Sequence, residues 1–285
     1  MLTKDEKRAI PFLLPGVLVT ALLIIYPLAY IISMSFSEDA MTMSGFAGLT
    51  NYLNLFKNPQ FPKAIVNTIY WTFGTVIFSF LIGFGLALLI NRRTVRAKGF
   101  WRSVIFIAWI IPGVVKATAW KWLFQTNGGM VNHILTSLGL ISEDIPWLTS
   151  QKYAMLSIII VQVWACAPYV MLMLNAGLQQ IPMDLYECAD LDGATWWQKT
   201  MRITLPLLKD ISFICILMTL VWAINEFSLI WIMTSGGHNT TTLSLLVYNQ
   251  FKVLNINSAA ASAVMQLIIT MAFAGLYVKF VIKED

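Results

Sequence analysis

Four polar side chains stand inside long apolar runs of the sequence: Lys116, Gln162, Asn225 and Glu226. A polar group within a membrane is costly, so such a group usually faces a partner or a water-filled path. Counted at ~1.5 Å per residue, Lys116 and Glu226 lie about 20 and 22 Å from one end of their runs, and Gln162 lies about 14 Å from the opposite end of its own. These depths predict one cavity near the middle of a membrane. There, Lys116 and Glu226 either form an ion pair or Lys116 faces an acidic solute.

The rest of the sequence carries no arrangement typical of catalysis or metal binding. Its apolar runs hold no paired carboxylates and no histidine cluster, and no glycine is followed by lysine, so there is no P-loop. His133 and His238 stand in polar segments without a second ligand nearby. The three cysteines, Cys166, Cys188 and Cys215, are too scattered for a disulfide framework or a metal site. We therefore expect no enzyme activity, no metal and no cofactor in this chain.

The elements that must position these residues are membrane spans. Of the 285 residues, 58% are apolar and 12% are charged, and the mean hydropathy is +0.71. Apolar runs of about 20 residues are long enough to cross a bilayer as helices. The sequence predicts an all-helical, polytopic membrane protein, with a single transmembrane domain over residues 1–285 and spans at about 10–34, 64–90, 103–124, 153–178, 211–233 and 259–281. A soluble enzyme, a nucleic-acid-binding protein and a secreted disulfide scaffold do not fit this composition.

The basic residues predict the orientation of the spans. Thirteen lysines and arginines flank one set of span ends, from Lys4 to Lys283, whereas four, Lys57, Lys63, Lys152 and Lys252, flank the other. Because lysine and arginine are enriched on the cytoplasmic side, both termini are expected in the cytoplasm. Within the second predicted span, Gly83 and Gly85 are expected to let neighbouring helices approach closely.

The cytoplasmic connection at residues 179–210 predicts a short amphipathic helix. Pro182 suits a first helical turn, and Asp184 complements the positive end of the helix dipole. Gly193 suits the left-handed residue that ends a helix. At 100° per residue the helix has an acidic and an apolar stripe. The acidic stripe comprises Asp184, Glu187 and Asp190, and the apolar stripe comprises Leu185, Cys188 and Ala189.

This connection carries a longer motif. Its residues match the pattern E-A-A, three residues, G, nine residues, I-x-L-P, with Cys188 in place of the first alanine. The motif resembles the cytoplasmic signature of permease subunits in binding-protein-dependent ATP-binding-cassette (ABC) importers, and the string LYECADLDGATWWQ looks most like the carbohydrate-uptake, maltose-type branch. The segments 111–124, 128–140 and 234–251 also resemble this family, with His238 where the family has proline.

The resemblance implies a six-helix, type I importer permease core whose loop docks on a separate ATPase. The residues that it assigns to this docking are Leu185, Glu187, Ala189, Asp192, Gly193, Ile203, Leu205 and Pro206. ATP and magnesium would be bound by that partner, and closure of the partner would rock the spans between two states. The expected partners are a second homologous permease subunit, two ATPase subunits, an extracytoplasmic solute-binding protein and membrane lipid, without nucleic acid. The expected location is the cytoplasmic (inner) membrane of a bacterium.

The resemblance also implies where a sugar would bind. Gln162, Cys166 and the run 223–228 match positions that line the sugar site in maltose-type permeases, and three aromatic side chains are expected to stack on sugar rings. The full set of expected path residues is Lys116, Gln162, Trp164, Cys166, Tyr169, Trp222, Asn225, Glu226 and Ser228.

Three alternatives remain at this point. The first is an ABC permease for a solute other than a sugar, which would have the same loop. The second is a proton- or sodium-coupled secondary carrier with Glu226 as its coupling acid, which leaves the segment from Glu187 to Pro206 unexplained. The third is a membrane-embedded enzyme, which lacks the necessary carboxylates or histidines.

Overall fold

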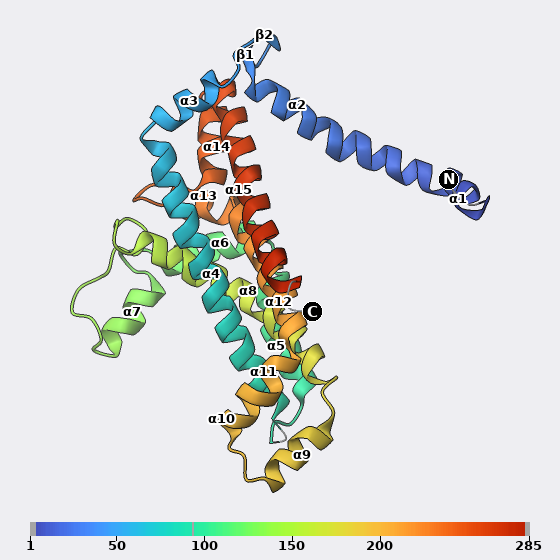
Figure 1. Cartoon of the computed structure of the whole chain (residues 1–285). Coiled ribbons are helices and arrows are strands. Elements are labelled where there is room, and N and C mark those ends of the chain that lie inside the picture. Colours follow the sequence, from blue (N-terminus) through green and yellow to red (C-terminus); the bar gives the residue numbers. More distant parts are fainter. Residues whose placement is uncertain (1–3, 93, 283–285) are drawn as a thin grey trace. The chain divides into compact units, whose positions relative to one another are not determined.

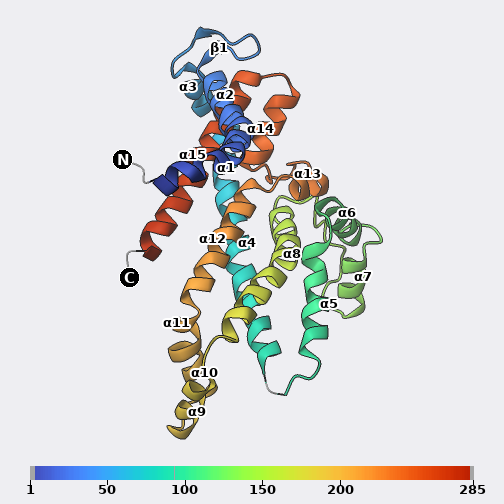
Figure 2. The same ribbon diagram turned by 90° about the vertical axis from the view of Figure 1, so that its right-hand side faces the viewer.

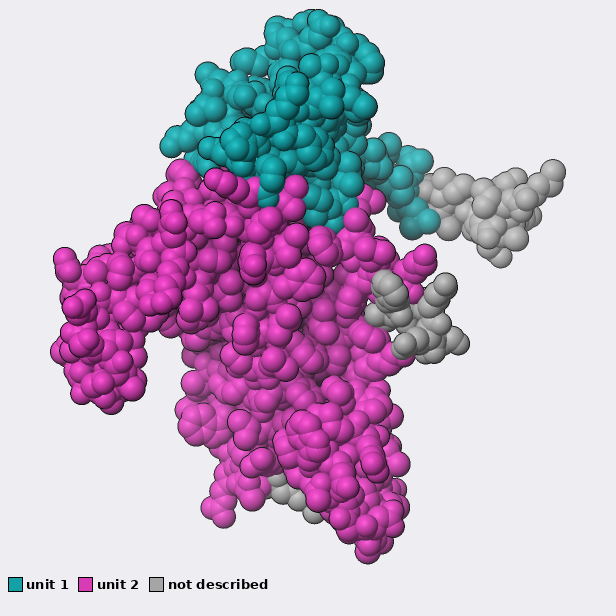
Figure 3. Space-filling view, turned by 60° about the vertical axis from the view of Figure 1, so that its left-hand side comes forward, with its two compact units in different colours: residues 1–62, 246–269 teal, residues 63–245, 270–285 magenta. Residues whose placement is uncertain are grey.

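The computed structural model describes residues 4–92 and 94–282, with side chains described for 12–92 and 94–279. Arg93 and Lys283, which contribute to the predicted basic side, lie outside the described residues. The chain forms two compact units, which Figure 3 distinguishes by colour. Unit 1 comprises Met1–Pro62 with Leu246–Ile269, and unit 2 comprises Lys63–Leu245 with Thr270–Asp285. The single domain expected over the whole chain stays a prediction.

Unit 1 begins with three helical segments that follow one another without a gap (Figure 1): α1 Lys4–Thr20, the π-helical turn η1 Ala21–Ile25 and α2 Tyr26–Ser35. A hairpin of β1 Ser37–Asp39 and β2 Ser44–Phe46 and the helix α3 Thr50–Lys57 come next. The hairpin connection is anchored by Asn257, whose side chain accepts the Ala40 N–H at 3.1 Å and donates to the Glu38 carbonyl at 2.7 Å. This polar segment therefore has regular structure, with a hairpin and a short helix.

Unit 2 holds the predicted site. In chain order the helices are α4 Gln60–Asn91, α5 Lys98–Ile110, α6 Gly113–Leu123, α7 Met130–Ser137, α8 Ala154–Leu178, α9 Met183–Leu191, α10 Trp196–Lys199, the π-helical turn η2 Thr200–Thr204, α11 Leu205–Leu207, α12 Lys209–Asn225 and α13 Ser228–Thr234. Helices α14 Leu243–Lys252 and α15 Ile256–Ile282 complete the chain and, like α4, contribute residues to both units.

The helices include several that are long and apolar enough to cross a membrane. Within the described residues there are four, Phe12–Ser35, Gln60–Asn91, Ala154–Leu178 and Ile256–Lys279, or up to six if each of two bent helix pairs is one span. The bent pairs are Lys98–Ile110 with Gly113–Leu123, at 92°, and Trp196–Leu207 with Lys209–Asn225, at 72°. The all-helical, polytopic fold is thus confirmed, whereas the third predicted span is a bent pair.

The bend in this third span occurs at Ile111 and Pro112, both of which have extended backbone with ψ of 127° and 141°. Proline lacks an N–H donor and disfavours helical backbone in the residue before it. The helix therefore ends at Ile110 and restarts at Gly113 in a new direction.

The fifth predicted span, 211–233, is also divided, between α12 and α13. The last carbonyl groups of α12 receive donors from other helices: Trp71 Nε1 of α4 donates to Ala223 O at 2.8 Å, in addition to the Glu226 N–H, and Ser244 Oγ donates to Ile224 O at 2.9 Å. These contacts stabilise the helix end inside the protein, where an unpaired carbonyl would be costly.

The core of unit 2 forms around α8. In the most apolar stretch of this helix, 61% of the residues are buried. Val170, Met171 and Leu174 of α8 pack with Ala87 of α4 and with Leu208. Gly83 of α4 faces α8 so closely that an added Cβ would lie 2.6 Å from the Val170 Cβ, whereas Gly85 has nothing within 4 Å. The predicted close approach is therefore confirmed at Gly83 and wrong at Gly85.

Candidate functional site

Unit 2 contains a cavity of about 500 Å³ where α5, α6, α8, α12 and α13 meet. Its size lies in the range of small-molecule sites. Its lining includes seven of the nine residues predicted for the solute path, namely Lys116, Gln162, Cys166, Trp222, Asn225, Glu226 and Ser228. It also includes Phe227, which lies in the run 223–228 that the resemblance places at the sugar site, and Trp109, which the prediction did not include. The cluster of polar residues inferred from depth along the sequence thus exists in the structure.

Gln162 is the most deeply placed polar group of this cavity, with a side chain only 4% exposed. Its Nε2 donates to the Cys166 Sγ, one helical turn further along α8, at 3.4 Å. Its Oε1 is buried and has no hydrogen-bond partner within the described part of the chain. Because a buried acceptor without a donor costs about 1–3 kcal/mol, this oxygen is suited to receive a hydroxyl or N–H group that enters the cavity.

Glu226 occupies the break between α12 and α13. Its Oε1 accepts the backbone N–H of Leu229 at 2.9 Å, so the carboxylate caps the first turn of α13. Lys116, on α6, lines the same cavity. Among the side chains that the structure describes, Lys116 and Glu226 form no ion pair, although both charges face one space. The carboxylate that the sequence places in a continuous span therefore has a local role at a helix start.

Two indole rings close one side of the cavity, and Tyr169, which the prediction placed in the solute path, packs against both without lining the cavity. Trp109 of α5 lies 5.0 Å from Tyr169 of α8 and 4.8 Å from Trp222 of α12, centroid to centroid, and Tyr169 lies 4.8 Å from Trp222. Trp109 and Trp222 line the cavity, and Tyr169 supports both rings from behind this lining. Trp109 could have been noticed in the sequence because it lies in the interior of a predicted span rather than near a span end. An indole N–H at such a position needs a hydrogen-bond partner.

Trp164 does not belong to the cavity, which corrects the prediction. Two residues along a helix correspond to a rotation of about 200°, so Trp164 projects away from the face that carries Gln162 and Cys166. Its ring packs instead on Trp120, at 5.5 Å, and remains 37% exposed.

The connection between α8 and α12 contains the predicted amphipathic helix, α9, with Pro182 as its N-cap. Gly193 has φ +73°, and the helix ends with two backbone hydrogen bonds, from Gly193 N to Asp190 O and from Ala194 N to Ala189 O, at 3.1 and 2.9 Å. This pair of bonds is a Schellman motif, which needs a left-handed residue such as glycine. The role predicted for Gly193 in ending the helix is confirmed.

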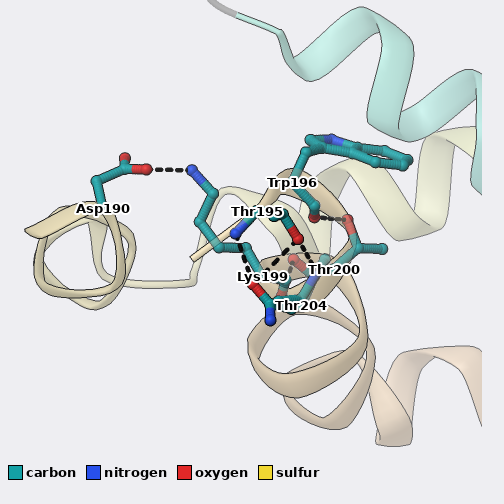
Figure 4. Close-up of polar contacts among 7 residues, drawn as sticks. Asp190, Thr195, Trp196, Lys199, Thr200 and Thr204 are labelled. Carbon is teal, nitrogen blue, oxygen red and sulfur yellow. Dashed lines mark hydrogen bonds and ion pairs between the residues drawn. The ribbon is translucent and has the colours of Figure 1, made fainter. Parts of the chain in front are cut away.

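A second short helix, α10, starts directly after this turn (Figure 4). Thr195 is its N-cap: the Thr195 Oγ1 accepts the Gln198 N–H at 3.3 Å, and the Gln198 Oε1 accepts the Thr195 N–H at 2.7 Å. This capping box fixes the start of the helix. Lys199 forms an ion pair with Asp190 of α9, so the two helices are joined beyond the turn.

A hydroxyl contact joins two parts of the connection, and an isoleucine attaches the connection to the membrane helices. The Tyr186 hydroxyl of α9 lies 2.9 Å from the Thr204 Oγ1 of η2. Ile203 of η2 packs against the core of α4 and α8 rather than facing outward. We define the two-helix loop as residues 182–207, comprising α9, α10, η2 and α11.

The surface of the two-helix loop is partly apolar. Leu185 is 43% exposed, Trp197 is 61% exposed, and Leu191, which the prediction did not include, is 90% exposed. Of the other residues assigned to docking, Glu187, Asp192, Gly193 and Pro206 are exposed, whereas Ala189 and Leu205 are half-buried. The loop thus presents apolar and acidic side chains on helices that are held rigidly.

Comparison with known proteins agrees with this architecture. Residues 79–283 match the family model described as binding-protein-dependent transport system inner membrane component. The trehalose/maltose transport system permease protein MalF of Thermococcus litoralis is 30% identical over 280 residues, covering 97% of this chain and 94% of the relative. The sulfoquinovosyl glycerol transport system permease protein SmoG of Agrobacterium fabrum is 32% identical over 287 residues, covering 99% and 92%.

Among solved structures, a chain of a bacterial ABC transporter involved in the import of the acidic polysaccharide alginate has the same fold. The TM-score is 0.85, the identity is 23%, and the match covers 98% of both chains. The fold expected from the resemblance, that of an ABC importer permease, is therefore confirmed. A family of transport components also decides against a secondary carrier and against a membrane-embedded enzyme. The chain belongs to the family of inner membrane components of binding-protein-dependent transport systems.

Proposed function

We propose that this permease forms one half of the pathway of an ATP-driven importer for a sugar or oligosaccharide. Relatives are named for trehalose and maltose, for sulfoquinovosyl glycerol and for diacetylchitobiose. The observation that carries the proposal is the cavity at Gln162, because it combines an unpaired buried acceptor with indole surfaces. A sugar offers what such a site needs, namely hydroxyl donors on its edge and C–H groups on its faces.

The path residues have distinct roles in this proposal. Gln162 accepts a hydroxyl hydrogen bond, Trp109 and Trp222 provide ring surface, and Tyr169 positions both indoles. Lys116 supplies ammonium donors to ring oxygens or to an acidic substituent. Asn225, Glu226 and Ser228 line the opposite wall, and Cys166 holds the amide of Gln162.

Energy comes from a partner ATPase through the two-helix loop. The exposed Leu185 and Leu191 are suited to an apolar groove, and Glu187 and Asp192 to basic groups beside that groove. Two copies of the ATPase bind ATP and magnesium, and their closure moves the loop as one body. The Schellman motif, the capping box and the Asp190–Lys199 pair support this, because a flexible loop would absorb the displacement instead of passing it to α12.

Three further partners complete the assembly. A second homologous permease forms the other half of the pathway, lipid covers the apolar outer faces, and an extracytoplasmic solute-binding protein delivers the sugar. A related alginate transporter was solved in complex with an alginate pentasaccharide-bound periplasmic protein. In this proposal the protein lies in the cytoplasmic membrane with both termini in the cytoplasm, an orientation that the excess of basic residues at one set of span ends supports.

The test is uptake by the complete transporter in proteoliposomes with ATP and magnesium supplied to the ATPase. Radiolabelled trehalose, maltose, diacetylchitobiose and an alginate disaccharide are compared with histidine and methionine. We expect ATP-dependent uptake of at least one saccharide. Uptake of an amino acid without uptake of any saccharide would contradict the sugar assignment and leave an ABC permease for another solute.

A further inference from the structure

Unit 2 contains a second cavity, of about 340 Å³, beside the segment that follows α13. Its lining includes Phe124 and seven polar residues, Lys121, Gln125, Thr126, Thr149, Thr234, Ser235 and His238. We name it the outer cavity, and we name the cavity at Gln162 the inner cavity. None of the residues that the sequence predicted for the solute path lies in the outer cavity.

The two cavities lie along the same pair of helices, α6 and α13, which pack side by side (Figure 2). On α6, Lys116 lines the inner cavity and Lys121 the outer one. On α13, Ser228 lines the inner cavity and Thr234 the outer one. Lys116 and Lys121 are five residues apart, which corresponds to about 7.5 Å along a helix, and Ser228 and Thr234 are six residues apart, which corresponds to about 9 Å. Both distances are longer than one sugar ring. A monosaccharide therefore cannot occupy both cavities at once.

The wall of the outer cavity is held in an unusual backbone conformation. Ser235, Gly236, His238 and Asn239 have φ of 51°, 78°, 53° and 62°. Left-handed backbone is uncommon for residues other than glycine, and it persists only where the surroundings fix it.

The contacts that fix this segment come from threonines and from α4. The Thr234 and Thr240 hydroxyls lie 2.6 Å apart, Thr241 Oγ1 donates to Gly236 O at 2.8 Å, and Asn67 Nδ2 of α4 donates to Thr241 O at 2.9 Å. These contacts hold the backbone of the segment that carries His238 in place. Binding to a wall that is already ordered costs less conformational entropy.

The chemistry of the outer cavity suits a neutral polyol. Gln125 and His238 supply amide and imidazole groups, and Thr126, Thr149 and Ser235 supply hydroxyls, so both donors and acceptors are present. Lys121 donates to the Ile232 carbonyl at 2.8 Å, which leaves two of its N–H groups for a ligand. No carboxylate is among the residues that line this cavity in the described part of the chain.

We propose that the outer cavity is a second saccharide subsite, which binds one unit of an oligosaccharide while another unit occupies the inner cavity. The proposal rests on the proposed sugar function and extends it, because it makes the preferred solute longer than a disaccharide. The polar side chains that line this subsite bind hydroxyls of the outer sugar unit.

The test compares a disaccharide with a tetrasaccharide of the same series in proteoliposomes containing the complete transporter. The series are maltose with maltotetraose, diacetylchitobiose with tetraacetylchitotetraose, and alginate disaccharide with alginate tetrasaccharide. The quantity measured is the ratio of the tetrasaccharide uptake rate to the disaccharide uptake rate, at saturating binding protein.

The variants are Thr149→Val, alone and combined with Gln125→Leu, because both side chains are exposed and neither supports the core. His238 is not replaced, because a substitution at its φ of 53° changes the backbone strain as well as the side chain. We expect the ratio to fall about tenfold in the double variant, which corresponds to a loss of about 1.4 kcal/mol of binding free energy. The ratio should fall less in the single variant. Thr136→Val, an exposed threonine of α7 outside both cavities, is the matched control and keeps the wild-type ratio.

The outcomes separate the two proposals. An unchanged ratio in the double variant overturns the outer subsite, and so does a wild-type transporter that takes up disaccharides but no tetrasaccharide. Uptake of no saccharide in any series overturns the sugar function itself, and with it the subsite.

Discussion

The hydroxyl of Tyr186 in α9 lies 2.9 Å from the hydroxyl of Thr204 in η2, eighteen residues further along the chain. This contact connects the exposed helix of the two-helix loop to the turn that leads into α12. A displacement of α9 can therefore reach a membrane helix through a short, direct route.

Removing this contact should weaken coupling without removing the loop. In Tyr186→Phe the lost hydrogen bond is worth about 1 kcal/mol, so we expect the sugar imported per ATP hydrolysed to fall about fivefold. The measurement is the ratio of uptake to phosphate release in proteoliposomes. Tyr70→Phe is the control, because Tyr70 is 67% exposed on α4. An equal ratio in both variants would mean that the Tyr186–Thr204 contact transmits nothing.

Backbone conformation at Gly193 gives a second prediction. An added Cβ would meet no atom within 4 Å, so a substitution acts through the φ of +73° alone. Gly193→Ala should weaken ATPase binding about fivefold, from roughly 1 kcal/mol of left-handed strain, whereas Gly193→Asn should weaken it less, because asparagine tolerates this conformation. Binding is measured by titrating the purified ATPase onto detergent-solubilised permease. Equal losses in the two variants would point to the missing glycine itself rather than to backbone strain.

The chain carries its own reporter of docking, Cys188. Cys188 on α9 is exposed, whereas Cys166 and Cys215 are buried. A maleimide should therefore label one thiol per chain in the permease alone, and docking of the ATPase on α9 should block this labelling. Mass spectrometry of tryptic peptides identifies the labelled residue. Full labelling of Cys188 in the assembled transporter would place the ATPase elsewhere.

The unpaired oxygen of Gln162 predicts opposite effects on stability and on uptake. In Gln162→Leu the buried acceptor disappears, so the melting temperature should be unchanged or higher, while uptake should fall about tenfold, because the hydroxyl of the solute loses its partner. Thermal unfolding and uptake are measured on the same preparation. Gln151→Leu, an exposed residue of the segment before α8, controls for loss of an amide. A variant that is less stable but still transports normally would show that Gln162 has a structural role.

Much of the two-helix loop could be predicted from local sequence. Pro182, the acidic first turn and Gly193 predict the bounds of α9 because capping and left-handed backbone depend on residue type at single positions. The convergence of Lys116, Gln162 and Glu226 also followed from depth along their helices. Trp164 could have been excluded in the same way, since its rotation relative to Gln162 is a property of the helix alone.

Other features depend on contacts between distant residues. The apolar run continues through Glu226, and the break after α12 exists because Trp71 and Ser244 satisfy its last carbonyls. The 92° bend at Pro112 also depends on a contact between distant residues. Proline predicts that the helix breaks there, but packing of α6 on α13 decides the direction that α6 takes after the break. The outer cavity combines α6, α13 and three loop segments, so no single stretch of sequence indicates it.

The most direct test of the account is whether accumulation of sugar requires the ATPase and the acidic side chain at Glu187. Proteoliposomes containing both permeases, the binding protein and ATP should accumulate sugar against a gradient when the ATPase is present and should not when it is omitted. With the ATPase present, Glu187→Ala should lower uptake at least fivefold, which corresponds to a loss of about 1 kcal/mol of docking free energy. Glu143→Ala, at an exposed glutamate outside the two-helix loop, should not lower uptake. Accumulation against a gradient without the ATPase would contradict the account.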